Sequence, residues 1–201
     1  VESRFFLKHL MTFDNVLASL MAAKTFDTDK RVLIFDHGKY NAKSKTWGRE
    51  GELPNQSAPS VQQTYGKYLK TVKVSMGRDS LSGFMYISVE HISPIFAKEF
   101  LELIIREANV LLRNRDMEES SQAIQYLKSE LSKTSLVEIQ ESINALIEAQ
   151  LETQMLSQIN EDYILVEIEP PFIPEQKSKP SYIHIISFCG GEMNAFYPFS
   201  I

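Results

Sequence analysis

The stretch from residue 93 to residue 158 constrains the fold of this chain more than any other part. After Pro94 it contains no glycine or proline, and its apolar residues recur at intervals of three and four, which predicts α-helix. Ser93 and Pro94 favour a helix start, because serine accepts a hydrogen bond from a free helix N–H and proline tolerates the first helical position. A single helix of this length would measure about 100 Å and leave an apolar stripe in water unless a partner covered it.

A break in the middle of this stretch offers a second solution. Residues 132–135 are Ser-Lys-Thr-Ser, which are poor helix formers, and Ser135 and Glu138 have the spacing of a capping box. We therefore predict a helical hairpin with arms at about 94–131 and 136–158, in which Ile143 and Leu146 pack inside. The alternative is one continuous rod in which Ser135 is an ordinary helical residue.

The remaining elements are shorter. Before residue 93, hydrophobic spacing and turn residues predict a helix with a possible interruption at Asp14 and Asn15, an aromatic turn, a short helix opened by a Ser60–Gln63 capping box, and a β-hairpin. After the long helical stretch, alternating apolar residues predict one more strand, and a proline-rich segment predicts an extended strap. In chain order, these elements occupy residues 3–23, 40–47, 60–69, 71–90, 163–169 and 170–180.

Together these patterns predict an α+β fold. We expect a base made of a small mixed or antiparallel sheet packed with helices, and a long protruding helical hairpin at about residues 94–158. The domain should cover residues 1–180, and residues 181–201 should form a separate tail. With 201 residues and 43% hydrophobic content, the chain is large enough to bury a core.

Composition argues against several classes of function. The net charge is −5, and no basic stripe is interleaved with aromatic residues, so nucleic-acid binding is not expected. The single cysteine, Cys189, excludes an internal disulfide framework and a cysteine-based zinc site. The four histidines lack metal-ligand spacing, and Glu167 and Glu169 are expected to be solvated strand residues rather than acid and base catalysts. We therefore expect no cofactor, no metal and no enzymatic activity.

Several segments, taken in order, resemble the Wzz-type chain-length determinants, a family of polysaccharide co-polymerases. The resemblance extends from about residue 3 to residue 180, and its specific parts are a strand-to-helix junction and the proline strap. The segments that carry it are Ser-Arg-Phe-Phe at 3–6, the turn at 40–47, Ile-Ser-Val-Glu-His-Ile-Ser-Pro-Ile-Phe-Ala at 87–97, Ala-Ile-Gln-Tyr-Leu at 123–127, and residues 168–180.

The resemblance implies a protein of the inner membrane of Gram-negative bacteria, with this region in the periplasm. It implies for this region an α/β base near the membrane with a helical protrusion. It implies a ring-like homo-oligomer, with no enzymatic activity of its own, that regulates the chain length of O-antigen or a related surface polysaccharide made by a separate polymerase. The polymerase and the growing polysaccharide would be its partners. The family has two transmembrane helices, so we expect this chain to be a piece of a longer protein, with its tail at the position of the second transmembrane helix, which should begin near Tyr182. The tail is atypical for such a helix, because Glu192, Asn194, two adjacent glycines and Pro198 make it a poor bilayer segment.

An assembly protein of this kind needs exposed helix faces for contacts between subunits. We expect these contacts at apolar residues left over after the hairpin seam is filled, together with charged residues from the polar stretch 113–122, whose other interpretation is a merely solvated segment. The alternative functions are a coiled-coil adaptor that binds another periplasmic protein through the same stripe, and an enzyme with an unrecognised site. The candidate interface residues are Leu103, Ile105, Leu112, Arg113, Arg115, Glu118, Ile147 and Leu151.

Overall fold

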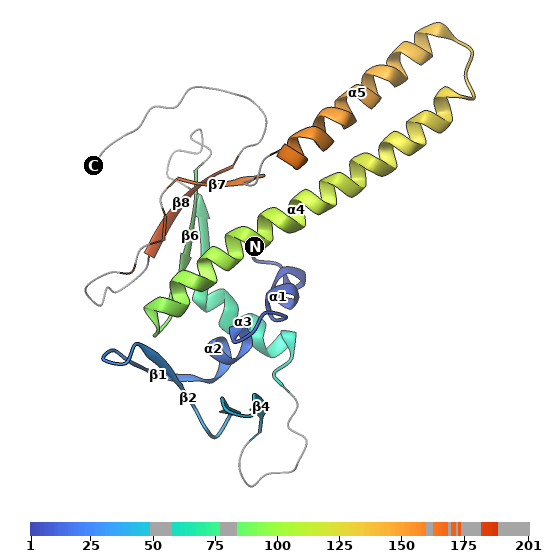
Figure 1. The fold of residues 1–201 in the computed structure, drawn as a ribbon. Helices are drawn as coiled ribbons and strands as arrows, with labels where there is room; N and C mark the ends of the chain where they lie inside the picture. The colour runs from blue at the N-terminus through green and yellow to red at the C-terminus, as the bar shows by residue number, and fades with distance from the viewer. Residues whose placement is uncertain are drawn as a thin grey trace. The chain divides into compact units, whose positions relative to one another are not determined.

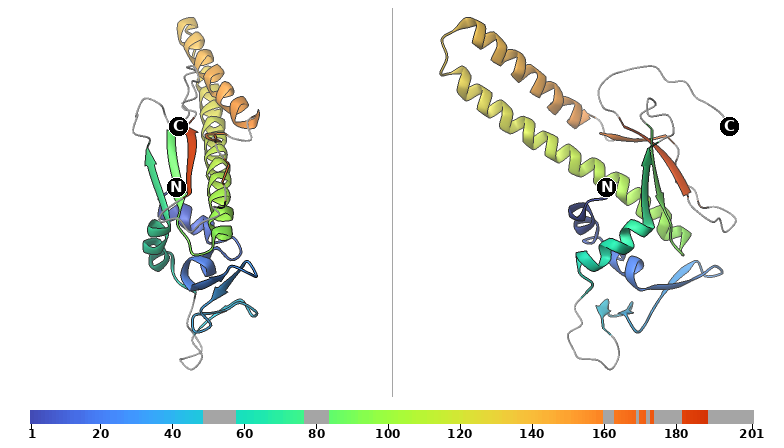
Figure 2. Two further views of the ribbon diagram at one scale, coloured as in Figure 1. Left: turned by 90° about the vertical axis from the view of Figure 1, so that its left-hand side faces the viewer. Right: turned by 180° about the vertical axis from the view of Figure 1, so that it is seen from behind.

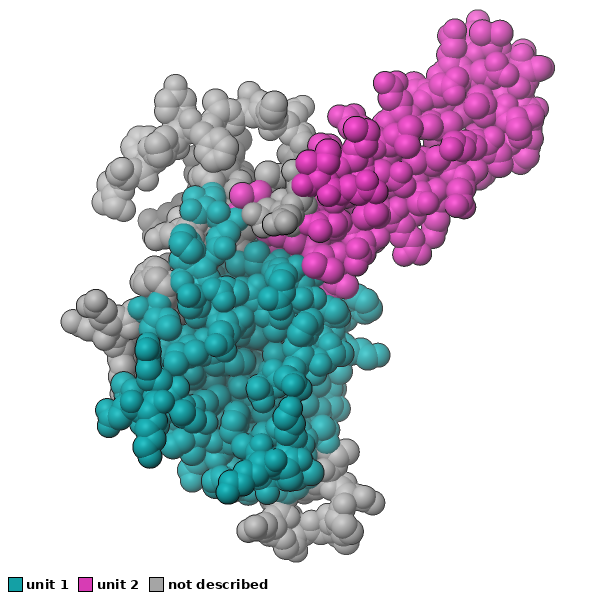
Figure 3. Space-filling model, viewed as in Figure 1, with its two compact units in different colours: residues 1–108, 167–186 teal, residues 109–166, 187–201 magenta. Residues whose placement is uncertain are grey.

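A computed structural model of the chain has an α+β fold with helices and small sheets (Figure 1). It divides into two compact units, coloured separately in Figure 3. Unit 1 comprises Val1–Ala108 and Glu167–Ile186, and unit 2 comprises Asn109–Val166 and Ser187–Ile201. The structure describes residues 1–48, 58–76, 84–159, 163–168, 170, 171, 173 and 182–188.

The first helical stretch is divided in two, as its sequence suggested. Helix α1 spans Arg4–Leu10, and the Ser3 hydroxyl accepts a hydrogen bond from the Phe6 N–H at 3.1 Å. Helix α2 spans Val16–Ala22 and begins after Asn15, whose φ of 65° is incompatible with a continuing α-helix. The predicted interruption is therefore confirmed.

Two small antiparallel sheets follow α2. Strands β1 (Ala23–Asp27) and β2 (Val32–Phe35) pair with each other, and β3 (Tyr40–Asn41) pairs with β4 (Thr46–Trp47). The Tyr40 ring lies 5.0 Å from the Trp47 ring and 5.4 Å from the Phe35 ring, against Ala18 and Ala22 of α2. The predicted aromatic turn is confirmed, whereas β1 was missed because its sequence, Ala-Lys-Thr-Phe-Asp, has little apolar alternation.

Helix α3 (Val61–Thr71) has the predicted capping box. The Ser60 hydroxyl accepts from the Gln63 N–H at 3.3 Å, and the Gln63 side chain accepts from the Ser60 N–H at 3.0 Å. Tyr68 is completely buried, and its ring contacts that of Phe100 at 6.3 Å. Leu69, the residue after Tyr68, is 38% exposed.

The main sheet contains the predicted β-hairpin. Strands β5 (Val72–Met76) and β6 (Phe84–Val89) are antiparallel, with Val72 opposite Val89 and Val74 opposite Ile87. The strand order is β5-β6-β8-β7, where β7 is Leu165–Glu167 and β8 is Tyr182–Phe188.

Strand β8 occupies the position at which the family resemblance implied the start of a second transmembrane helix. Among the residues that the structure describes, none of the helices combines the length and the apolar character that crossing a membrane requires. Most of the proline strap and the tail beyond residue 188 lie outside the described residues.

The long helical stretch is a hairpin, so the prediction of two arms is confirmed and the continuous rod is wrong. Helix α4 spans Pro94–Leu131 and helix α5 spans Val137–Ile159. Ser93 caps α4 by accepting from the Phe96 N–H at 3.2 Å.

The predicted capping box at Ser135 and Glu138 is replaced by a different helix start. The Leu136 carbonyl accepts the first helical hydrogen bond of α5, from the Gln140 N–H at 3.0 Å. The Gln140 side chain donates to the Thr134 carbonyl at 2.9 Å, and the Thr134 hydroxyl accepts from the Leu136 N–H at 3.4 Å. The side chains of Thr134 and Gln140 therefore bind the free backbone groups at this helix start, a role that was predicted for Ser135 and Glu138.

His91 links three elements of unit 1. Its Nε2 lies 3.0 Å from the Ser19 carbonyl, and its Nδ1 accepts from the Ser93 N–H at 3.1 Å, so the ring fits as the neutral tautomer with the proton on Nε2. The ring also contacts Phe96, whose own ring stacks on Phe100. Burial lowers the pKa of His91, although both backbone hydrogen bonds act in the opposite direction.

This environment predicts a loss of stability in mild acid. The pKa of His91 is lower in the folded state than in the unfolded state. The stability that the neutral His91 ring contributes is therefore fully present above about pH 6.5, the usual histidine pKa, and is lost as pH falls through the folded-state pKa. Urea unfolding at several pH values should show a smaller loss of unfolding free energy between pH 7 and pH 5 in His91→Gln. The exposed control His37→Gln should behave as wild type, and equal pH profiles for all three proteins would contradict this role.

Asn109 holds the returning chain against α4 within unit 2. Its Oδ1 accepts from the N–H groups of Ile164 and Leu165 at 3.1 and 2.8 Å, and its Nδ2 donates to the Leu165 carbonyl at 2.9 Å. Asn109 is buried, so water has little access to this site. Its side chain therefore supplies the hydrogen-bond partners that these backbone groups need there. Nearby, the Tyr163 hydroxyl donates to Asp116 at 3.0 Å.

Asn109→Ala should therefore lower the free energy of unfolding by about 3 kcal/mol, because it leaves buried backbone donors without their acceptor. Asn114→Ala, at an exposed position of the same helix, should change stability by no more than about 0.5 kcal/mol. Chemical denaturation measures both effects, and hydrogen exchange at the Leu165 amide should accelerate only in the Asn109 variant. Similar stabilities of the two variants would refute the role given to Asn109.

Candidate interaction surface

The hairpin helices of unit 2 face each other along a narrow seam. Figures 1 and 2 show α4 and α5 side by side from different directions. On each helix one row of buried and half-buried positions recurs at intervals of three and four, the spacing of a coiled-coil seam, and Asp116, Ser121, Ala123, Glu130 and Thr153 are half-buried beside it. The positions of the row are Met117, Ser120, Ile124, Leu127 and Leu131 on α4, and Gln140, Ile143, Ile147, Gln150, Gln154 and Ser157 on α5.

The α5 side of this seam is mostly polar. Only Ile143 and Ile147 are apolar there, and the other positions are glutamine or serine. Ser157 is completely buried and satisfies its hydroxyl by donating to the Gln154 carbonyl of its own helix at 2.8 Å. The buried Ser120 of α4 similarly donates to the Met117 carbonyl at 3.2 Å. The seam therefore uses only a small part of the apolar content of α5.

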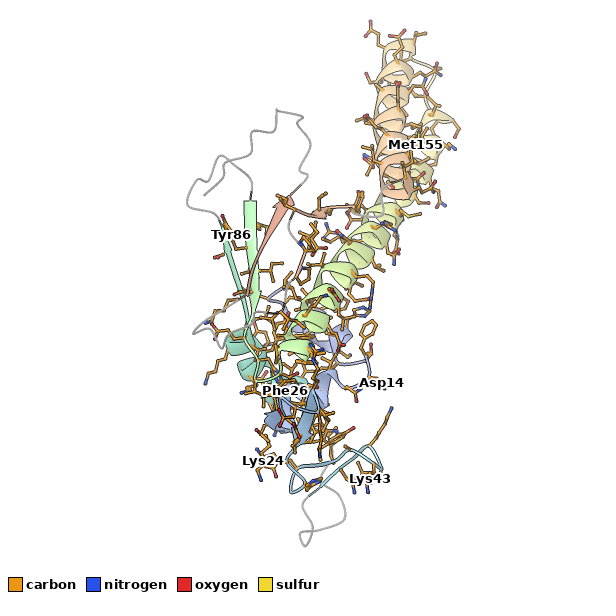
Figure 4. The ribbon with its side chains drawn as sticks, turned by 60° about the vertical axis from the view of Figure 1, so that its left-hand side comes forward. Asp14, Lys24, Phe26, Lys43, Tyr86 and Met155 are labelled. Carbon is orange, nitrogen blue, oxygen red and sulfur yellow. The ribbon has the colours of Figure 1, made fainter. Side chains whose placement is uncertain are left out.

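The rest of that apolar content is exposed. Leu151, Met155 and Ile159 recur every four residues and are 45%, 60% and 72% exposed. Met155 is labelled on the hairpin in Figure 4. Such a row on one side of a helix is typical of a protein interaction surface. We call the following set the α5 face, because helical spacing places its members on one side of the helix: Val137, Glu141, Asn144, Glu148, Leu151, Glu152, Met155 and Ile159.

The structure places the predicted interface residues in three different environments. Leu103 and Ile105 are buried within unit 1 and so present little surface. The half-buried residues are Leu112, Arg113 and Ile147, and the exposed ones are Arg115, Glu118 and Leu151.

Only Leu151 of the predicted interface residues belongs to the α5 face. Ile147 lies in the seam, and Arg115 pairs with Asp116 and Glu119 of its own helix at 3.4 and 3.5 Å. The exposed neighbours Met155 and Ile159 were not among the predicted interface residues. One sequence signal distinguishes the seam from the exposed face. Glutamine and serine recur at intervals of three and four in register with Ile143 and Ile147, which places all of them on the side of α5 that faces α4.

Leu146 corrects the predicted packing of the hairpin. It was expected inside with Ile143, but its side chain is 54% exposed, whereas Ile143 is buried. Leu146 is three residues from Ile143, so the two positions lie about 60° apart around the helix axis. A seam this narrow covers one of them and leaves the other at its edge.

The clearest polar cluster of unit 1 has an architectural explanation. His9 Nε2 lies 2.8 Å from Glu107 Oε2, and Arg106 Nε donates to the other oxygen of Glu107 at 3.2 Å. This arrangement ties α1 to α4. Within the described part of the chain, no group of three or more histidine, cysteine, aspartate and glutamate side chains could hold a metal ion.

The structure describes one of the two glutamates considered as possible acid and base. Glu167 is exposed at the end of β7, and Glu169 lies outside the described residues. The α5 face is consequently the feature of the described residues most suited to a function.

Comparison of the chain with protein-family models, with curated proteins and with solved structures gave no match in any of the three searches.

The seam and the exposed positions predict different responses to a buried charge. Ile143→Asp should lower the free energy of unfolding by about 3 kcal/mol or more, because an unpaired carboxylate would enter the seam. The matched change Leu146→Asp should cost less than about 1 kcal/mol, because water reaches this position. Thermal and urea unfolding provide the measurement, and equal losses in both variants would contradict the proposed seam.

Proposed function

We propose that this chain is part of a non-enzymatic, self-assembling regulator of surface polysaccharide chain length, of the polysaccharide co-polymerase kind. In this proposal it acts in the periplasm as part of an inner-membrane homo-oligomer. Its partners are further copies of itself, a polysaccharide polymerase and the growing polysaccharide. The length of the polymer depends on the geometry of the assembly rather than on a reaction centre.

The exposed α5 face is the observation that carries this proposal. A helix with unpartnered apolar side chains along one side gains stability when a protein surface covers it. Two further features support the proposal: the α+β fold with a long helical hairpin is the architecture that the family resemblance implies, and the resembling segments extend through both units.

Light scattering across a range of protein concentrations tests the assembly. We expect one discrete oligomer, and we expect the double change Leu151→Asp with Met155→Asp to shift the equilibrium strongly toward monomer. Gln125→Asp, at an exposed position of α4, is the control and should leave the oligomer unchanged. A wild-type chain that stays monomeric at every concentration would contradict self-assembly through this face and favour the adaptor function.

The polysaccharide itself tests the biological role. Deleting the gene in the bacterium that carries it should broaden or shift the distribution of surface polysaccharide lengths, as resolved by gel electrophoresis. Restoring the wild-type gene should return the original distribution, whereas the Leu151 and Met155 double variant should not. An unchanged distribution after deletion would refute the proposed function, whatever the oligomeric state.

A further inference from the structure

The α5 face carries charges of one sign only. Between Val137 and Ile159 the helix contains four glutamates and no lysine or arginine. Glu141, Glu148 and Glu152 lie on the same side as the exposed Leu151 and Met155, and all three glutamates are exposed. A partner must therefore cover apolar side chains and also accept a row of carboxylates.

This pattern argues against two α5 faces packing on each other. In a two-fold contact, the same patch of both subunits meets itself. Such a contact would bring the glutamates of one helix close to those of the other, and like charges held together at an interface weaken it. The surface that best receives the α5 face is therefore a different one, with apolar and positively charged side chains.

Unit 1 presents such a surface on two helices that pack together, α1 and α3. Neither helix contains an aspartate or a glutamate. Two apolar side chains are exposed there, Phe5 at 74% and Leu69 at 38%. The exposed cations of the two helices are Arg4, Lys8, Lys67 and Lys70.

A direct contact joins the two helices at this surface. The Arg4 guanidinium of α1 lies over the Tyr65 ring of α3, 5.1 Å from its centroid, in a cation–π arrangement. Tyr65 and Leu69 are four residues apart and therefore lie on the same side of α3. Lys67 lies on the other side of α3, about 160° from Leu69 around the helix axis. We call the α1/α3 surface the set formed by Arg4, Phe5, Lys8, Leu69 and Lys70.

We infer that the α5 face of one copy docks on the α1/α3 surface of a second copy. Leu151, Met155 and Ile159 then contact apolar side chains such as Phe5 and Leu69, while the glutamates lie near the cations. Because the two patches differ, each copy has one free patch after the first contact, and further copies add until the arrangement closes. This inference rests on the proposed self-assembly and adds to it the identity of the two contacting surfaces.

A charge-exchange experiment tests the pairing. The acidic side is reversed in Glu148→Lys with Glu152→Lys, and the basic side is reversed in Lys8→Glu with Lys70→Glu. Each variant alone should associate at least about 10-fold more weakly than wild type, because like charges then meet. An equimolar mixture of the two variants should recover association, because the reversed patch of one variant matches the reversed patch of the other.

The control variant has the same change in net charge as the basic-side variant, but at exposed lysines outside the proposed contact. Lys24→Glu with Lys43→Glu alters two lysines of unit 1 that lie outside α1 and α3 and are labelled in Figure 4. Light scattering and analytical ultracentrifugation give the association constants, and circular dichroism verifies that every variant folds. The control should associate like wild type.

Each outcome separates this inference from the proposed function. If the Leu151 and Met155 double variant abolishes assembly but the charge reversals do not weaken it, the α5 face is an interface and the α1/α3 pairing is wrong. If both reversals weaken association but their mixture does not recover, the two patches do not contact each other. If the wild-type chain does not associate at all, both the pairing and self-assembly through this face are wrong.

Discussion

The exposed α5 face depends on one constraint: a two-helix seam can cover only a narrow strip of each helix. Helix α4 meets two very different environments along its length. In unit 1 it is buried on several sides, with Phe100, Leu101 and Ile104 almost inaccessible to water. In the hairpin part of unit 2 the buried positions of α4 are Ser120 and Ile124, and the other covered positions are half-buried. Apolar residues beyond the covered positions must be covered by something else or remain in water.

The composition of the seam explains why α5 retains so much exposed apolar surface. Glutamine and serine occupy most of its covered positions, and their polar groups can bond within the same helix or turn, as Ser157 and Gln140 do. A seam of this kind fixes the arrangement of the helices without using the leucines and the methionine of α5. Within unit 2, the hydrogen bonds of the buried Asn109 fix the returning chain in addition to the seam.

Local signals predicted most of the fold. Helix breaks, capping residues and the β-hairpin depend on neighbours a few residues apart, so Asn15, the Ser60–Gln63 box and the two arms of the long hairpin could be predicted from the sequence. The cap of α5 was predicted incorrectly because Ser135 and Thr134 offer similar hydroxyls at adjacent positions. Strand β8 was not predicted, because the family resemblance implied the start of a transmembrane helix at the same residues.

The interaction surface was harder to predict because it depends on rotation about the helix axis. Periodicity identifies a helix, but a helix with apolar residues on several sides does not reveal which side its neighbour covers. Leu146 and Ile143 are three residues apart and differ in burial for this reason alone. Leu103 and Ile105 likewise looked available for a subunit contact, although the packing of unit 1 buries both.

Magnitudes indicate what an assembly built on the α5 face requires. Fully burying one large aliphatic side chain contributes about 1.5 to 3 kcal/mol, so the three partly exposed residues Leu151, Met155 and Ile159 together contribute roughly 4 kcal/mol. Loss of translational and rotational freedom on association costs an estimated 4 to 15 kcal/mol, so these residues cannot by themselves hold two copies together.

The complementary charges and the exposed Phe5 and Leu69 are therefore necessary parts of the contact that we propose. Closure into a ring adds a further gain, because the last subunit makes two contacts for a single loss of freedom. An interface that is weak as a pair and stable only when closed favours one discrete assembly size. A regulator that sets a preferred polymer length through its geometry requires this property.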